Sequence, residues 1–140
     1  MSSSSPNDFN SRIIEQFRAN GGRVGPPFEN TPLLLLHHTG ARTGTARVNP
    51  VAYLADGNRY VIFASKGGAP TNPDWYHNLR AHPDVTIEVG TDTLKATAHE
   101  VTGAERERLF AAVAERSPNF AEYQRKTERR IPVIVLEPAS

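Results

Sequence analysis

Two tight turns constrain the fold of this chain more than any other sequence feature. The turns are Asp56-Gly57-Asn58 and Gly90-Thr91-Asp92, and each lies between two runs rich in β-branched, aromatic or alternating residues. Such turns predict antiparallel hairpins. The strands that we expect around them are 47–55, 59–64, 85–89 and 94–101. Because hairpins join antiparallel neighbours, this pattern argues against a parallel sheet with helical crossovers.

Further predicted elements complete a barrel. Additional strands are expected at 33–38, which returns through the turn 39–45, and at 131–136. Helices are expected at 7–20, at 73–80, after the capping box Thr102-Gly103-Ala104-Glu105, and from Ser117 to Tyr123. Six mostly antiparallel strands with an N-terminal helix and inserted helices predict an α+β fold built on a small barrel. A doubly wound dinucleotide fold is disfavoured, since turn 39–45 lacks the fingerprint and leads into a strand.

Composition fits one domain over residues 1–140, with a polar tail at 1–6. The chain has 140 residues, 38% of them hydrophobic, which is enough to bury about two-thirds of its unfolded surface. Sixteen Lys and Arg against fifteen Asp and Glu leave a net charge of +1, so we expect no nucleic-acid partner. The chain has no cysteine and no histidine pattern typical of a metal site, so we expect no metal. No long apolar run is present, and the expected location is the cytoplasm.

The N-terminal helix, residues 7–20, is predicted to be amphipathic. Phe9, Ile13 and Phe17 are spaced four apart and therefore share one face. One interpretation is that this face packs on the barrel as a lid. The alternative is that it covers a lipophilic substrate entrance or makes a peripheral contact with the inner face of the membrane.

The segment 64–79 predicts an anion-binding corner between a strand and a helix. Gly67 and Gly68 allow close approach of a ligand to the backbone, and Lys66 adds a positive charge. A helix that begins at Asn72-Pro73-Asp74 would offer free N–H groups, and Trp75-Tyr76 would add flat aromatic surfaces. A ligand with a phosphate and a ring is implied. The alternative is a glycine-rich connection with two core aromatics.

Two arginines are expected near the same corner. Arg42 and Arg47 lie on either side of the turn 39–45, close to the strand that ends at Lys66 in the predicted meander. Guanidinium groups suit phosphate or carboxylate, and the hydroxyls of Thr43 and Ser65 are further donors. The alternative is ordinary surface charge.

Five motifs together resemble the deazaflavin-dependent nitroreductase family of actinobacteria. They are Thr39-Gly40-x-Arg42-Thr43-Gly44, Arg47-x-x-Pro50, Ala64-Ser65-Lys66-Gly67-Gly68, Asn72-Pro73-x-Trp75-Tyr76-x-Asn78-Leu79 and Arg130-Ile131-Pro132-Val133. They span nearly the whole chain, and the third and fourth together are far more specific than either alone. The resemblance implies a split β-barrel related to flavin-reductase and FMN-binding barrels. It also implies coenzyme F420, an 8-hydroxy-5-deazaflavin, and reduction of quinones or, in some members, nitroaromatic compounds.

The resemblance also implies roles for individual residues. The anionic phosphodiester and oligoglutamate tail of F420 would contact Arg42, Thr43, Arg47 and Lys66. The implied cofactor residues, which include those that line the deazaflavin and its linker, are Arg42, Thr43, Gly44, Arg47, Asn49, Pro50, Ala64, Ser65, Lys66, Gly67, Gly68, Pro73, Asp74, Trp75, Tyr76 and Asn78.

Substrate contacts are implied at Ser117, Phe120 and Tyr123, where characterised members of the family place tyrosines. Only Tyr123 matches. Its phenol could stabilise the oxyanion that hydride delivery creates on a quinone, so Tyr123 and the hydroxyl of Ser65 are the expected catalytic groups. Ser117 and Phe120 change the size and polarity of the acceptor site, and the alternative for Tyr123 is a packing or surface role.

Three functional classes remain at this point. The first is an F420H2-dependent quinone reductase, the second an FMN enzyme of the related barrels, and the third a non-catalytic protein that binds or stores F420. Split barrels of flavin-binding relatives are often dimers, so a homodimer is one candidate assembly.

Overall fold

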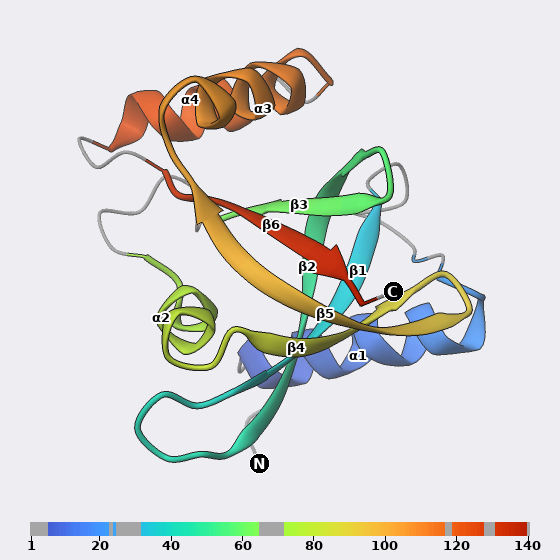
Figure 1. Cartoon of the computed structure of the whole chain (residues 1–140). Helices are drawn as coiled ribbons and strands as arrows, with labels where there is room; N and C mark the ends of the chain where they lie inside the picture. Colours follow the sequence, from blue (N-terminus) through green and yellow to red (C-terminus); the bar gives the residue numbers. More distant parts are fainter. Residues whose placement is uncertain are drawn as a thin grey trace.

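Six antiparallel strands close into a barrel in this computed structural model (Figure 1). The structure describes residues 6–22, 24, 32–64, 72–116, 119–127 and 131–139. The strands are β1 (Leu33–Thr39), β2 (Ala46–Asp56), β3 (Arg59–Phe63), β4 (Asp84–Val89), β5 (Asp92–Val101) and β6 (Val133–Pro138). Their order is β1-β2-β3-β6-β5-β4, and β4 pairs with β1 to close the ring. The predicted small antiparallel barrel is confirmed.

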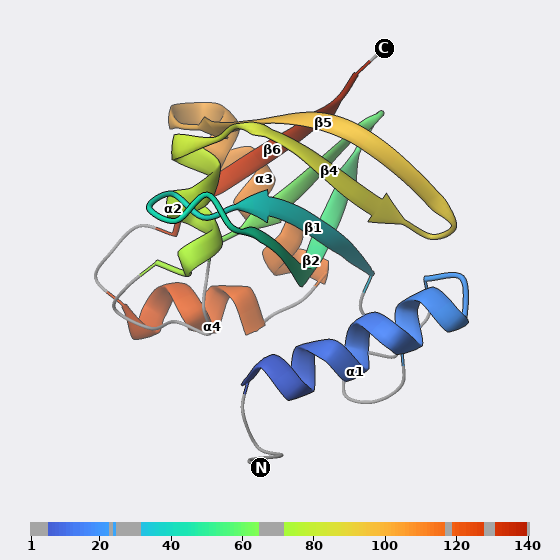
Figure 2. The same ribbon diagram turned by 90° about the horizontal axis from the view of Figure 1, so that it is seen from below.

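Four helices lie around the barrel in the described part of the chain. They are α1 (Pro6–Ala19), α2 (Asp74–Ala81), α3 (Gly103–Arg116) and α4 (Asn119–Lys126). Figures 1 and 2 show α3 and α4 together at one side and α2 at a barrel end, beside β1 and β5. Figure 1 shows that the connection between β1 and β2 extends past the barrel on the side where α2 lies. This arrangement puts a loop and a helix start next to each other.

The turns and one helix start differ slightly from expectation. Val89 pairs with Asp92 and Asp56 pairs with Arg59, so each hairpin turn has only two residues. Gly57 and Gly90 adopt φ values of 63° and 58°, the left-handed conformation that such turns require. The expected cap at Asn72 is wrong, because Pro73 occupies the N-cap position of α2 without a side-chain capping bond and Asp74 is the first helical residue.

The barrel interior is filled by one row of side chains from each strand. On β1 this row is Leu34, Leu36 and His38, since alternate residues of a strand share a face. The interior cluster also contains Val51, Ile62, Ile87, Ile134 and Leu136, with Trp75, Tyr76 and Leu79 from α2. The hydrophobic side of α2 therefore belongs to the barrel core.

A second hydrophobic cluster lies outside the barrel, beneath α3. It joins Val61, Phe63, Val133 and Val135 of the strands to Leu109, Phe110 and Val113 of α3, with Phe120 and Tyr123 of α4 packed against it. Arg106 is also buried here and donates to the carbonyl of Ile131 at 2.9 Å.

Helix α1 packs on the outside of the barrel beside β2 (Figure 2). Ile13 and Phe17 are 2% and 1% exposed, so the part of the apolar face that they form is covered. The side chain of Phe9 lies outside the described part of the chain. Arg18 donates to the Glu88 carboxylate on β4 at 2.6 Å, and this bond holds the pKa of Glu88 below its ordinary value. These contacts favour the lid over a free amphipathic surface. Within the described residues, no helix is long and apolar enough to cross a membrane.

Candidate functional site

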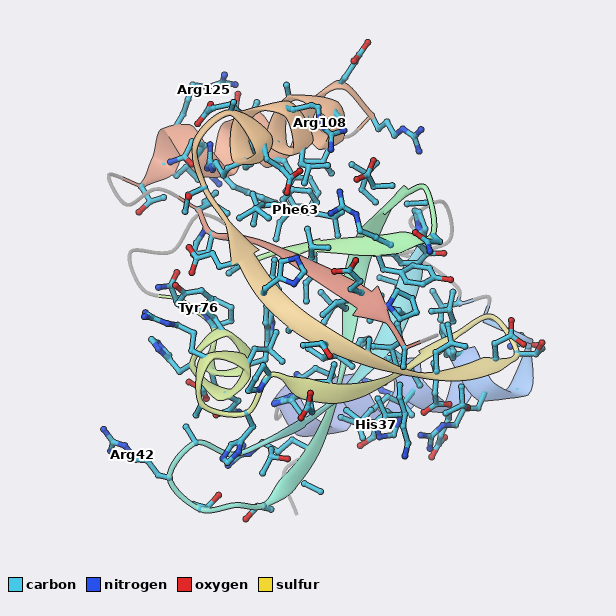
Figure 3. All side chains as sticks on the ribbon, viewed as in Figure 1. His37, Arg42, Phe63, Tyr76, Arg108 and Arg125 are labelled. Atoms are coloured by element: carbon cyan, nitrogen blue, oxygen red, sulfur yellow. The ribbon has the colours of Figure 1, made fainter. Side chains whose placement is uncertain are left out.

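A pocket of about 510 Å³ lies between the β1–β2 loop and α2. The residues that line it come from the loop, the start of β2 and the first turns of α2. They are Gly40, Ala41, Arg42, Thr43, Arg47, Asp74, His77 and Asn78. Figure 3 shows Arg42 projecting from this loop, far from the arginines labelled on α3 and α4. The pocket therefore combines residues that are more than thirty positions apart in sequence.

The loop is closed by its own hydrogen bonds. Gly40 N–H donates to the carbonyl of Thr45 at 2.9 Å, and Gly44 N–H donates to the carbonyl of Gly40 at 2.9 Å. Thr45 N–H donates to Thr43 Oγ1 at 3.2 Å. A Cβ at position 40 would lie 2.5 Å from that hydroxyl oxygen, so a larger residue there would displace the Thr43 side chain and disturb its bond to Thr45 N–H. Arg42 is thus carried on a defined loop.

Asn78 of α2 connects this loop to the helix through a hydrogen bond. Its side chain is 6% exposed, and its Oδ1 accepts the Ala41 N–H at 2.8 Å. Its Nδ2 lies 3.0 Å from His38 Nδ1, and His38 Nε2 lies 2.7 Å from Asn49 Oδ1. Burial lowers the pKa of His38 below its ordinary value of 6.5. His38 lies at the end of the interior row of β1 and was not predicted as a site residue; alternation along the strand indicates only that it faces inward.

The pocket favours an anionic ligand. Two of its lining residues, Arg42 and Arg47, are exposed guanidinium groups, against the single carboxylate of Asp74. Because guanidinium groups bind phosphate and carboxylate oxygens with paired donors, the site can hold a polyanionic chain.

The structure separates the predicted cofactor residues into three groups. Arg42, Thr43, Arg47, Asp74 and Asn78 line the pocket. Seven others lie outside its lining: Gly44, Asn49, Pro50, Ala64, Pro73, Trp75 and Tyr76. Ser65, Lys66, Gly67 and Gly68 lie outside the described residues, as does the substrate candidate Ser117.

The aromatic pair of α2 is buried rather than displayed at the pocket. Trp75 and Tyr76 are 9% and 6% exposed and belong to the barrel core. Tyr76 O–H donates to Glu100 Oε1 at 2.6 Å, and burial raises the pKa of Tyr76. Pro50 pairs with Leu35, on the row of β2 that faces away from the interior. The expectation of open aromatic surfaces beside the pocket is therefore not met among these residues.

Tyr123 and Phe120 lie in another part of the molecule. Both are half-buried, with ring centroids 5.6 Å apart, and Phe120 is 5.4 Å from the Phe63 ring. They pack against the cluster beneath α3. The structure brings these two substrate candidates together but does not place them in the lining of the pocket. No cluster of three or more metal-ligating side chains occurs among the residues described.

Comparisons with known proteins agree with this architecture. The chain is 44% identical over 124 residues to an F420H(2)-dependent quinone reductase of Mycobacterium tuberculosis, covering 86% of this chain and 83% of the relative. A solved F420-H2 dependent reductase (FDR-A) superposes with a TM-score of 0.70 at 41% identity, covering 76% and 94% of the two chains. A solved domain-swapped dimer gives a TM-score of 0.73 at 37% identity, covering 95% and 100%. Residues 11–138 match the family model described as F420H(2)-dependent quinone reductase, and the chain belongs to that family.

Proposed function

We propose that this protein transfers a hydride from reduced coenzyme F420 to a quinone, and that the pocket beside α2 holds the cofactor's anionic tail. The main support is that Arg42 and Arg47 line the same pocket. Asn78 fixes the loop that carries Arg42 by accepting the Ala41 N–H. Family membership supplies the identity of the cofactor. Nitroaromatic acceptors are a second proposed substrate class.

The residues of the pocket fit this cofactor. A phosphodiester and a glutamate chain present several anionic oxygens, which the two guanidinium groups can bind through charge-assisted hydrogen bonds. The pocket has a volume of about 510 Å³, which is enough for part of an extended chain rather than for a single ion. Asp74 faces the same space and would disfavour crowding of anionic groups at the helix start. Thr43 also lines the pocket and adds a neutral hydroxyl donor.

The deazaflavin supplies a hydride when bound, because carbon replaces the reactive nitrogen of flavin and favours two-electron transfer. The protein has to hold the acceptor close to the ring and exclude water. Ser65, Lys66, Gly67 and Gly68 remain proposed cofactor contacts, and they follow the buried Ala64 directly in sequence.

Tyr123 remains the proposed donor to the acceptor oxygen, together with Ser65. Replacing Tyr123 with Phe keeps the ring that packs against the cluster beneath α3 and removes only the hydroxyl. We expect an unchanged F420 dissociation constant, within about twofold, and a fall in kcat/KM for menadione of about tenfold, or about 1.4 kcal/mol. Steady-state kinetics at saturating F420H2 measures this.

Tyr53→Phe is the matched control, because Tyr53 is also half-buried and packs against Tyr60 at a ring distance of 5.4 Å. This substitution should leave the F420 dissociation constant and kcat/KM for menadione unchanged. If Tyr123→Phe behaves like this control, Tyr123 has a packing role. If it weakens F420 binding with unchanged turnover, Tyr123 contacts the cofactor instead.

Titration of the protein with F420 and with FMN tests the cofactor assignment. We expect F420 to bind and FMN, which carries a phosphate but no oligoglutamate chain, to bind more weakly. Tighter binding of FMN would favour the related FMN enzymes. Binding of F420 without oxidation of F420H2 by menadione under anaerobic conditions would favour the storage role.

Assembly and location are separate proposals. We propose a homodimer, supported by the similar structure that is a domain-swapped dimer, and light scattering after size exclusion tests it. We also propose a cytoplasmic location. A peripheral membrane contact through α1 would have to use side chains other than Ile13 and Phe17, since these are covered by the barrel.

A further inference from the structure

A buried polar network lies directly beneath the pocket. Among the residues with a described burial, only His38, Asn78 and Arg106 are buried polar or charged side chains. The first two are bonded to each other, at 4% and 6% exposure, where β1 meets α2. A buried histidine that is bonded on both ring nitrogens has a fixed orientation.

The orientation of every group in this network follows from one backbone N–H. Ala41 N–H can only donate, so Asn78 presents Oδ1 to it. The Asn78 amide nitrogen therefore faces His38 Nδ1, which must carry a lone pair to accept from it. The imidazole proton is then on Nε2, where it donates to Asn49 Oδ1. His38 is neutral in a single tautomer.

We propose that neutral His38 is a positioning residue for the pocket. By accepting from Asn78, it keeps the amide in the orientation that binds the Ala41 N–H. That bond fixes the loop that presents Arg42 to the ligand. The inference rests on the proposed function only in naming F420 as the ligand, because the network is present in the chain itself.

Protonation of His38 would break this arrangement. Nδ1–H would then face the donating Asn78 NH2, and turning the amide over would place NH2 against the Ala41 N–H. Either orientation opposes two donors. The bond to Asn49 and the charge of Asp74 favour protonation of His38, whereas Arg47 of β2 and the neighbouring imidazole of His37 disfavour it. Burial has the largest influence and lowers the pKa of His38.

The direction of the pH effect follows. A histidine with a lowered folded-state pKa stabilises the fold fully above its ordinary value of 6.5, and this contribution is lost as the pH falls from 6.5 through the lowered value. Loop order and affinity for an anionic ligand should decline only as the pH falls through the lowered pKa, because that is where His38 of the folded protein takes up a proton. A simple charge effect would have the opposite sign, because a protonated imidazole attracts an anion.

NMR of the histidine side chains in the protein without cofactor is the first test. We expect His38 to show the Nε2–H tautomer at about pH 8 and a pKa below 6.5. Asn78→Asp offers a second acceptor in place of the NH2 group, so it should convert Nδ1 to a donor and raise the His38 pKa above that of the parent. An Nδ1–H tautomer in the parent, or a pKa unmoved by Asn78→Asp, would overturn the inference.

Equilibrium titration of F420 at about pH 8 and at about one pH unit below the His38 pKa that NMR gives is the second test. We expect the parent to bind about fivefold or more weakly at the lower pH. In His38→Asn the side-chain oxygen occupies the place of Nδ1 and cannot titrate in this range, so its affinity relative to the parent should improve on acidification. Because the variant and the parent are compared at the same pH, any effect of protonation of F420 itself cancels.

His37→Asn is the matched control. His37 is the next residue of β1, points to the other face, and lies 2.6 Å from Glu88 through Nε2. It should keep a pH dependence of the same sign as the parent, because burial, which this substitution leaves in place, has the largest influence on the pKa of His38 and His37 a smaller one. Stronger F420 binding by the parent at the lower pH, or equal pH dependence in His38→Asn, contradicts the inference. Failure of the parent to bind F420 at either pH contradicts the proposed function instead, and the imidazole measurement still decides the role of His38.

Discussion

Replacing Arg42 and Arg47 together with Ala is expected to weaken F420 binding by about 100-fold, or about 2.7 kcal/mol. A hydrogen bond to a charged group contributes about 1.5–3 kcal/mol, and exposure of the two side chains lowers the gain for each. The loss should shrink at high salt, because the pocket is open to screening ions. Fluorescence titration at two ionic strengths measures both effects.

Arg108→Ala with Arg125→Ala is the matched control for charge. These two arginines are exposed on α3 and α4, far from Arg42 in Figure 3, and pair with Asp56 and Glu122. The control removes the same net charge but should change F420 affinity by less than about twofold. Equal losses in the two double variants would mean that overall charge, rather than the pocket, attracts the cofactor.

Phe17→Ala is expected to destabilise the protein by about 3–5 kcal/mol, the usual cost of truncating a fully buried phenylalanine. Phe17 is 1% exposed between α1 and the barrel. Truncation leaves a cavity under the helix and loosens its attachment, which Arg18 and Glu88 also support. Urea unfolding measures the free energy of unfolding.

Arg12→Ala on the exposed side of α1 is the corresponding control and should change stability by less than about 0.5 kcal/mol. A loss below about 1 kcal/mol for Phe17→Ala would show that α1 is only loosely attached. In that case a role for its apolar face at a membrane or substrate entrance would regain support.

The barrel could be predicted from the sequence because its signals are local. The turns at Gly57 and Gly90 and the alternating strands around them define the hairpins without reference to distant residues. The closure of β4 on β1 depends on contacts between remote segments, and here the prediction of a barrel relied on strand number and known architectures.

The site was predictable only in part. Arg42 and Arg47 flank one turn, so their proximity follows from the hairpin, and both line the pocket. The position of Trp75 was harder to predict, because an aromatic residue after a glycine-rich segment can equally well line a ligand site or lie in the core. In the structure Trp75 packs in the barrel core. His38 was missed because a histidine beside another on a strand carries no local sign of which partner it finds.

Anaerobic oxidation of F420H2 by menadione, followed by the visible absorbance of the oxidised deazaflavin, tests the central claim most directly. We predict that the parent protein catalyses this reaction, that reduced FMN does not replace F420H2, and that the Arg42→Ala/Arg47→Ala variant needs about 100-fold more F420H2 for half-maximal rate. No protein-dependent oxidation of F420H2, or equal turnover with reduced FMN, would contradict the account.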